Sequence, residues 1–127
     1  MIEKRRGIAR MLHALLNSSR GLAYVWKNEA AFRQELMLFV FLTPFAFLIS
    51  ERASDVVLLL LSLWLVLIVE VINTSIEVVV NRIGFEPHEL SGVAKDVGSA
   101  AVMLSLLVAF LVWSVFVFAY LQQLFAW

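Results

Sequence analysis

The sequence contains no cysteine. This absence excludes disulfide bonds, thiolate metal sites and cysteine nucleophiles. An excess of charge of either sign is also lacking, because 10 Lys and Arg residues balance 10 Asp and Glu residues. The chain therefore has no overall basic field to attract nucleic acid, and we expect no nucleic-acid partner. The phosphate-loop pattern G-x-x-x-x-G-K-[ST] and the protein-kinase signatures are absent too, so any nucleotide site must be of another kind.

Apolar residues, by contrast, are in large excess. They make up 62% of the 127 residues, and the mean hydropathy is +0.91, whereas globular chains usually hold ~45–50% apolar residues. A soluble domain of this length could not bury so much apolar surface, so the excess must face lipid. We expect a single membrane-embedded domain over residues 1–127. The basic start is not followed by an unbroken apolar core and a cleavage site, so we expect the N-terminus to be retained.

Residues 5–29 predict an amphipathic surface helix. Apolar residues recur there at helical spacing, and basic residues occupy other positions. A basic helix of this kind tends to lie in the membrane interface. We expect Ser18, Ser19 and Gly21 to bend or interrupt it.

Three strongly apolar segments follow, and each is expected to cross the membrane as a helix, since ~20 residues span ~30 Å of hydrocarbon. Their expected bounds are about 30–50, 55–81 and 92–122. The predicted fold class is an all-α membrane protein with one surface helix and three transmembrane helices. Lys and Arg gather before the first segment, whereas the 50–55 loop holds only Arg52. Because cytoplasmic flanks carry the excess of Lys and Arg, we expect the N-terminus and the 81–96 loop on the cytoplasmic side.

The second apolar segment carries three polar residues on one helical face. Glu70, Asn73 and Glu77 are spaced i, i+3 and i+7. One interpretation is a hydrogen-bonded packing device between helices. The other is a functional site, because an ionisable side chain at membrane depth costs at least ~2.5–3.5 kcal/mol on insertion scales. Glu77 lies close to the cytoplasmic loop, and Glu70 lies ~10 Å further in at helical rise, so a soluble anion could reach the first and a lipid headgroup the second.

Two further polar clusters flank this segment. In residues 28–35, Glu29 and Arg33 are spaced to form a surface ion pair, worth only ~0.3–0.5 kcal/mol. Beside Glu77, however, Glu29 is also a candidate partner for Mg²⁺, which takes a few oxygen ligands together with substrate phosphates. In residues 86–99, Lys95 could offset phosphate charge, and His88 is either a nucleobase contact or a solvated loop residue.

Three stretches resemble the prokaryotic-type diacylglycerol kinase family. They are N-E-A-A-F-R-Q-E (28–35), E-V-I-N-T-S-I-E (70–77) and H-E-L-S-G-V-A-K-D-V-G-S-A-A-V (88–102). The resemblance covers nearly the whole chain and is most specific from 70 to 102. It implies a homotrimer that uses MgATP to phosphorylate the membrane lipid diacylglycerol to phosphatidic acid at the bacterial inner membrane, with a cytoplasmic active site.

The same resemblance implies a role for individual residues. Glu70 would be the general base, and Glu29 and Glu77 would hold the metal. The implied ATP contacts are Arg10, Asn17, Glu29, Glu77, Glu86, His88, Lys95 and Asp96. The implied lipid-substrate contacts are Arg10, Ala31, Glu35, Glu70, Asn73 and Ser99. Asn17 stands where the family often contributes a nucleotide contact, in a region whose sequence varies within the family. Pro87 leaves the nucleotide-contacting loop without one backbone donor.

Two alternatives remain at this stage. An undecaprenol kinase of the same superfamily would use the same metal and base residues on another lipid alcohol. A non-enzymatic membrane oligomer would use Glu70 as a proton or ion carrier, and would need neither Glu29 nor Lys95. The coincidence of three polar clusters at one membrane face favours the kinase.

Overall fold

The computed structural model describes residues 6–125, which form four helices and no strand. The helices are α1 (Ile8–Asn28), α2 (Ala30–Ile49), α3 (Ala53–Ile83) and α4 (Glu89–Leu124). The predicted fold class is confirmed, with one N-terminal helix followed by three helices long and apolar enough to cross a membrane. Arg5, the first residue of the predicted surface helix, lies outside the described residues.

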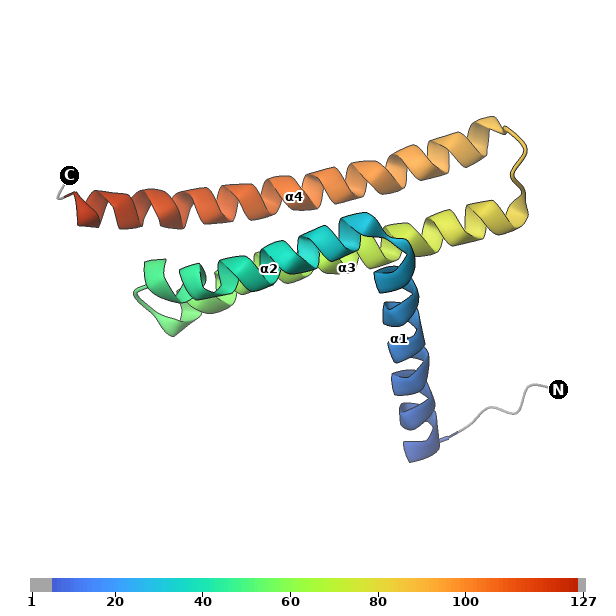
Figure 1. Cartoon of the computed structure of the whole chain (residues 1–127), viewed down its shortest axis with the longest axis horizontal. Helices are drawn as coiled ribbons and strands as arrows, with labels where there is room; N and C mark the ends of the chain where they lie inside the picture. The colour runs from blue at the N-terminus through green and yellow to red at the C-terminus, as the bar shows by residue number, and fades with distance from the viewer. Residues whose placement is uncertain (1–5, 126–127) are drawn as a thin grey trace.

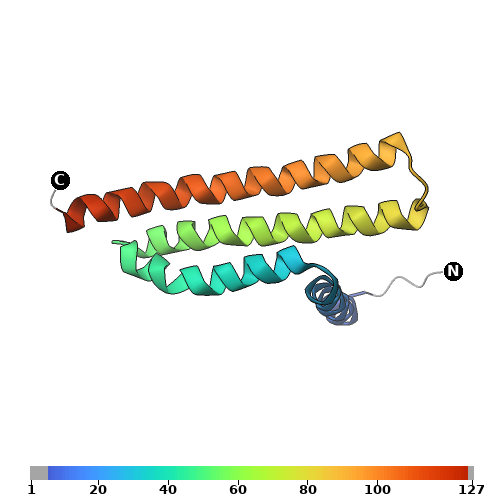
Figure 2. The same ribbon diagram turned by 45° about the horizontal axis from the view of Figure 1, so that its top comes forward.

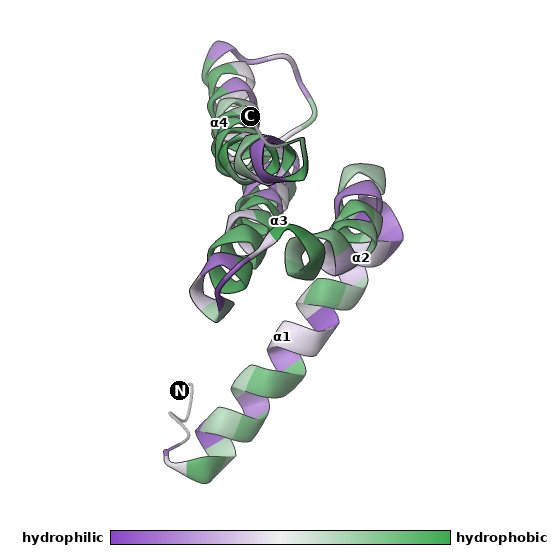
Figure 3. Ribbon diagram, turned by 90° about the vertical axis from the view of Figure 1, so that its left-hand side faces the viewer, coloured by the Kyte–Doolittle hydropathy of each residue, from purple (hydrophilic) through white to green (hydrophobic). Residues whose placement is uncertain are grey.

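Helices α2, α3 and α4 run side by side, and α3 lies between the other two (Figures 1 and 2). Helix α1 leaves this bundle steeply and runs across its long axis. If the bundle axis follows the membrane normal, α1 therefore lies along the membrane plane. Hydrophilic and hydrophobic bands alternate along α1 in Figure 3, as an interfacial helix requires.

The three bundle helices differ in length, which determines the shape of the molecule. Helix α2 has 20 residues, whereas α3 has 31 and α4 has 36. At ~1.5 Å per residue, α2 matches the ~30 Å hydrocarbon core, and α3 and α4 exceed it by ~15–25 Å. At the α3–α4 loop this hairpin projects beyond the level at which α1 joins α2, and at the other end α4 also extends past α2 (Figures 1 and 2).

Helix α1 is continuous through the residues expected to interrupt it. The Ser18 hydroxyl donates to the Ala14 carbonyl at 2.8 Å, and the Ser19 hydroxyl donates to the Leu15 carbonyl at 2.9 Å. Both serines thus satisfy their polar groups within the helix, and Gly21 lies in its interior. The expected break is therefore wrong, because back-bonding to the preceding turn lets serine remain helical.

The chain turns sharply at Glu29, which has an extended backbone (φ −115°, ψ 105°) between α1 and α2. The Arg33 guanidinium donates from Nη1 to the carbonyls of Trp26 at 2.6 Å and Lys27 at 3.2 Å. A cation that satisfies the last carbonyls of a helix stabilises its C-terminus. Arg33, predicted as an ion-pair partner of Glu29, is thus a cap that holds α1 at its angle.

Apolar packing fixes the level of this turn along α3. Val25 of α1, Phe32 of α2 and Leu67 of α3 form one buried cluster, against which Val71 also packs. Glu70 lies between Leu67 and Val71 in the sequence of α3. The α1–α2 turn and Glu70 are therefore at the same height in the bundle.

Polar contacts tie α4 to α3 at two heights and to the α2–α3 connection at a third. The Trp113 indole donates to the Leu59 carbonyl at 3.3 Å, and the Lys95 ammonium donates to Asn81 Oδ1 at 3.0 Å. At the end of the bundle away from the hairpin loop, the Gln123 amide donates to the carboxylate of Glu51. These contacts fix the register of the two long helices, which otherwise meet through apolar side chains.

Candidate active site

Two carboxyl groups from different helices meet inside the bundle. Glu70 of α3 is only 4% exposed, and its carboxyl group is within hydrogen-bonding reach of that of Glu35, which is half-buried on α2. Ionised carboxylates only accept hydrogen bonds, so a hydrogen bond between these two groups would require one of them to carry a proton. Oε2 of Glu35 is buried and has no hydrogen-bond partner. The pair therefore retains an acceptor atom that no group of the described chain satisfies.

Asn73 lies one helical turn from Glu70 and is 8% exposed. Its Oδ1 atom is buried and has no hydrogen-bond partner. The side chain lies against Gly98 of α4, where an added Cβ would collide with Asn73 Oδ1 and lie 3.4 Å from Asn73 Cγ. Gly98 is itself buried. The missing Cβ thus makes room for the Asn73 amide, whose buried oxygen has no hydrogen-bond partner in the described chain.

Glu29 and Glu77 complete a cluster of acidic groups. Both are half-buried, and both lie near enough to Glu70 to interact with it electrostatically. Glu29 comes from the α1–α2 turn, and Glu77 lies two turns beyond Glu70 toward the hairpin loop. Among residues 6–125, no three His, Cys, Asp or Glu side chains are arranged to hold a metal ion. A metal here would rest on two carboxylates and take its other ligands from elsewhere.

The α3–α4 hairpin loop forms a separate polar hollow of about 490 Å³. Its lining residues include Glu86, His88 and Lys95. His88 is the N-cap of α4, and its Nδ1 atom accepts from the Leu90 backbone N–H at 3.1 Å. This cap explains why α4 begins at Glu89 rather than at residue 92. His88 therefore has a structural task that neither the nucleobase nor the solvated-loop interpretation included.

Asn81 is a residue that the sequence reasoning missed. It lies one turn beyond Glu77 on α3, and its side-chain oxygen holds the Lys95 ammonium. Gly98 was missed as well, because its importance depends on how α4 sits against Asn73. No local signal marks either residue, since both contacts depend on the register between α3 and α4.

Several predicted site residues stay apart within one chain. Arg10 and Asn17 are exposed on α1, which extends away from the hairpin loop (Figure 1). Ala31 is exposed at the start of α2, while Asp96 and Ser99 are exposed on α4. The single chain thus brings together Glu29, Glu35, Glu70, Asn73 and Glu77 and, separately, Glu86, His88 and Lys95.

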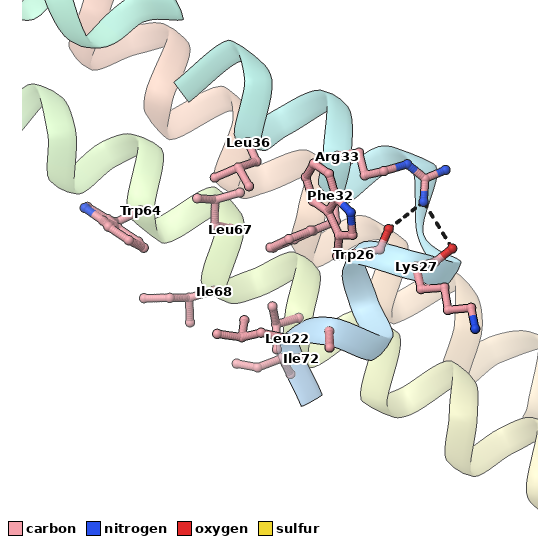
Figure 4. A pocket seen from close by; sticks show the side chains of 12 residues that line it. Leu22, Trp26, Lys27, Phe32, Arg33, Leu36, Trp64, Leu67, Ile68 and Ile72 are labelled. Atoms are coloured by element: carbon pink, nitrogen blue, oxygen red, sulfur yellow. Dashed lines mark hydrogen bonds between the residues drawn. The ribbon is translucent and has the colours of Figure 1, made fainter. Parts of the chain in front are cut away.

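A large apolar groove of about 1160 Å³ lies in the angle between α1, α2 and α3 (Figure 4). Trp26 of α1, Phe32 of α2 and Trp64 of α3 are among its lining residues. Arg33 and Lys27 are at its polar end. Its apolar lining beside the Glu70 level suits hydrocarbon chains rather than a soluble ligand.

Comparison with known proteins points to one family. The family model described as prokaryotic diacylglycerol kinase matches residues 16–117. The diacylglycerol kinase of Escherichia coli (strain K12) is 43% identical over 120 residues, which are 94% of this chain and 98% of that protein. The diacylglycerol kinase of Haemophilus influenzae is 41% identical over 87% of this chain and 93% of that protein. That of Helicobacter pylori (strain 26695) is 37% identical over 91% of each.

Proposed function

Because this chain belongs to the prokaryotic diacylglycerol kinase family, we propose that it transfers the γ-phosphoryl group of ATP to the hydroxyl of diacylglycerol, giving phosphatidic acid. The resemblance seen in the sequence is thereby confirmed, and the chain is an enzyme of a kinase family. The alternative of a non-enzymatic membrane oligomer is removed. We place the α3–α4 hairpin loop and α1 at the cytoplasmic face of the bacterial inner membrane, following the distribution of Lys and Arg.

The observation that carries the proposal is the proximity of half-buried Glu35 to buried Glu70 at the height of the α1–α2 turn. At that height a lipid hydroxyl emerging from the membrane reaches Glu70 while its chains remain in hydrocarbon. Glu70 accepts the hydroxyl proton, the lipid oxygen bonds to the γ-phosphorus, and ADP leaves. Glu35 and Asn73 would orient that hydroxyl, and the buried oxygen atoms without a hydrogen-bond partner on both side chains support this role.

Mg²⁺ fits the two remaining carboxylates. Glu29 and Glu77 come from different elements but face the same buried acid, Glu70, whose negative charge a cation between them would offset. Mg²⁺ is commonly bound through one or two carboxylates plus substrate phosphates rather than by an all-protein cage. When bound, it would neutralise charge on the transferring phosphoryl group.

ATP is proposed to bind along the projecting part of the hairpin, with Lys95 against the phosphates and Glu86, His88 and Asp96 around the rest of the nucleotide. Arg10 and Asn17 cannot join this site from the same chain in the observed arrangement (Figure 1). In a homotrimer, a neighbouring copy of the chain would supply Arg10 and Asn17 to this nucleotide site. Apolar side chains on the projecting hairpin support such an assembly, since Ile83 is 77% exposed and Leu90 is 71% exposed in the single chain.

The decisive assay uses purified protein in lipid–detergent micelles with labelled ATP and scores phosphorylated lipid. Diacylglycerol and a polyprenol are supplied in competition, because an undecaprenol kinase would use the same acids. We expect label in phosphatidic acid and its loss when Mg²⁺ is chelated. Much faster phosphorylation of the polyprenol would overturn the substrate, and absence of label in either lipid would overturn the proposed reaction.

A further inference from the structure

A second hollow lies in the angle between α1 and the projecting part of α3 (Figure 1). It has a volume of about 450 Å³ and is lined by Tyr24 of α1 and by Val78, Asn81, Arg82 and Phe85 of the hairpin. Asn81 and Phe85 also line the polar hollow at the hairpin loop, so the two hollows meet there. We call the one beside α1 the aromatic hollow, since Tyr24 and Phe85 both carry rings.

Both rings of the aromatic hollow are open in the single chain. Tyr24 is 49% exposed and Phe85 is 87% exposed. Within residues 6–125, neither ring stacks on another aromatic ring. A single exposed aromatic residue is ordinary on a protein surface, but Tyr24 and Phe85 come from different elements and line the same hollow. Two open rings beside polar groups suit a flat aromatic ligand, which can stack on them.

The polar residues of the aromatic hollow narrow the choice of ligand. Arg82 is exposed, and a guanidinium group binds phosphate oxygens and also stacks on planar rings. The Asn81 side chain accepts a hydrogen bond from the Lys95 ammonium at 3.0 Å. Asn81 therefore connects the aromatic hollow to the cation that is proposed to hold the phosphates. A ligand that combines a flat ring with phosphate groups matches both features.

The aromatic hollow is also close to the proposed metal ligands, Glu29 and Glu77. Val78 directly follows Glu77, and Tyr24 precedes Glu29 by five residues, which is roughly 7 Å at helical rise. A ring held between α1 and the hairpin would thus lie within the length of a nucleoside triphosphate from the metal. The volume of the hollow is within the ~300–1,000 Å³ usual for small-molecule sites.

We propose that the aromatic hollow binds the nucleobase of the phosphoryl donor, with the base stacked against Tyr24 and Phe85 and with Arg82 at its edge. This inference rests on the proposed function, because it names the place where the nucleotide of that reaction holds its base. The polar hollow then remains for the ribose and the phosphates. A lipid chain is a poorer occupant, because Asn81 and Arg82 are polar and lie on the projecting part of the hairpin.

The test follows the base directly, with the triphosphate of 2-aminopurine riboside as the probe. The fluorescence of this base falls when it stacks on an aromatic ring. Full-length protein in micelles, with Mg²⁺ and without lipid substrate, is titrated with the probe. We expect saturable quenching by the wild type. Tyr24→Ala and Phe85→Ala should each weaken binding of the probe at least about fivefold and reduce the quenching at saturation.

Conservative and remote variants serve as controls. Tyr24→Phe and Phe85→Trp keep a ring in the hollow and should keep the affinity of the wild type. Phe118→Ala removes a ring that is 57% exposed on α4, far from the hairpin loop, and should do the same. Losses in Tyr24→Phe and Phe85→Trp as large as those in the alanine variants would overturn the proposal, because stacking would then not be the cause.

Two further results would overturn the proposal. One is saturable binding of the probe by the wild type without quenching, which needs no substitution to observe. The other is wild-type affinity and quenching in both alanine variants, which would leave the two rings to contacts with a second copy of the chain. Either result would leave the proposed reaction standing if the wild type still transfers labelled phosphate from ATP to diacylglycerol. Absence of that transfer would instead refute the reaction itself.

Discussion

The contact between Gly98 and Asn73 allows a sharp prediction. In the variant Gly98→Ala, the new methyl group would collide with Asn73 Oδ1, with Asn73 Cγ at 3.4 Å and Ile76 Cδ1 at 3.7 Å. The Asn73 amide is the end of a short side chain, so it can rotate away while the helices stay in place. The substitution should thus displace one functional group rather than unfold the bundle.

The expected energies separate stability from activity. Alanine gains about 1 kcal/mol over glycine in a helix interior, and a tight contact costs about 1–3 kcal/mol. The two effects nearly offset each other, so the free energy of unfolding should change by less than about 2 kcal/mol. Turnover should fall at least about tenfold, because the amide no longer orients the lipid hydroxyl beside Glu70.

The assay is lipid phosphorylation in micelles, alongside a denaturant titration of the same preparation. Gly21→Ala is the matched control, since Gly21 is also within a helix but an added Cβ there meets no atom within 4 Å. It should retain wild-type turnover. Wild-type turnover in Gly98→Ala, with stability unchanged, would refute the claim that this glycine positions Asn73 for the reaction.

Three further substitutions probe the nucleotide side. Glu77→Gln should raise the Mg²⁺ concentration needed for half-maximal rate and weaken ATP binding together; an unchanged metal titration would remove Glu77 from the metal site. Asn81→Ala should raise the KM for ATP severalfold with little change in kcat, because Lys95 loses the acceptor that holds it; an unaltered KM would make this contact incidental. His88→Ala should destabilise the start of α4 by about 0.5–2 kcal/mol, and His88→Asn should restore that stability because asparagine caps well. Failure of His88→Asn to restore stability would contradict the capping role.

The fold class follows from the sequence because it depends on the length and apolarity of continuous segments. A helix needs ~20 residues to cross the membrane, and the uncharged run from Leu36 to Ile49 is shorter than that. The helix was therefore expected to begin earlier, near Ala30. The continuity of α1 could not be predicted in the same way. It depends on whether Ser18 and Ser19 bond to the preceding turn or to other groups, and local sequence permits both.

The acidic site was only partly predictable, for a related reason. Helical spacing alone places Glu70, Asn73 and Glu77 on one face, since these residues share a helix. The pairing of Glu70 with Glu35 depends on the height at which α2 packs against α3. That height is determined by apolar contacts around Leu67, which leave no pattern in the sequence.

The central claim is that Glu70 is the base of a lipid kinase, and Glu70→Gln tests it most directly. Glutamine preserves the shape of the side chain but cannot accept the hydroxyl proton. The measurement compares ATP binding and transfer of labelled phosphate to diacylglycerol in the same micelles, with Glu51→Gln at the far end of the bundle as the control. We expect Glu70→Gln to bind ATP as the wild type does and to lose about 10²–10⁴-fold in turnover, while the control keeps the wild-type rate. Wild-type turnover in Glu70→Gln would contradict the account.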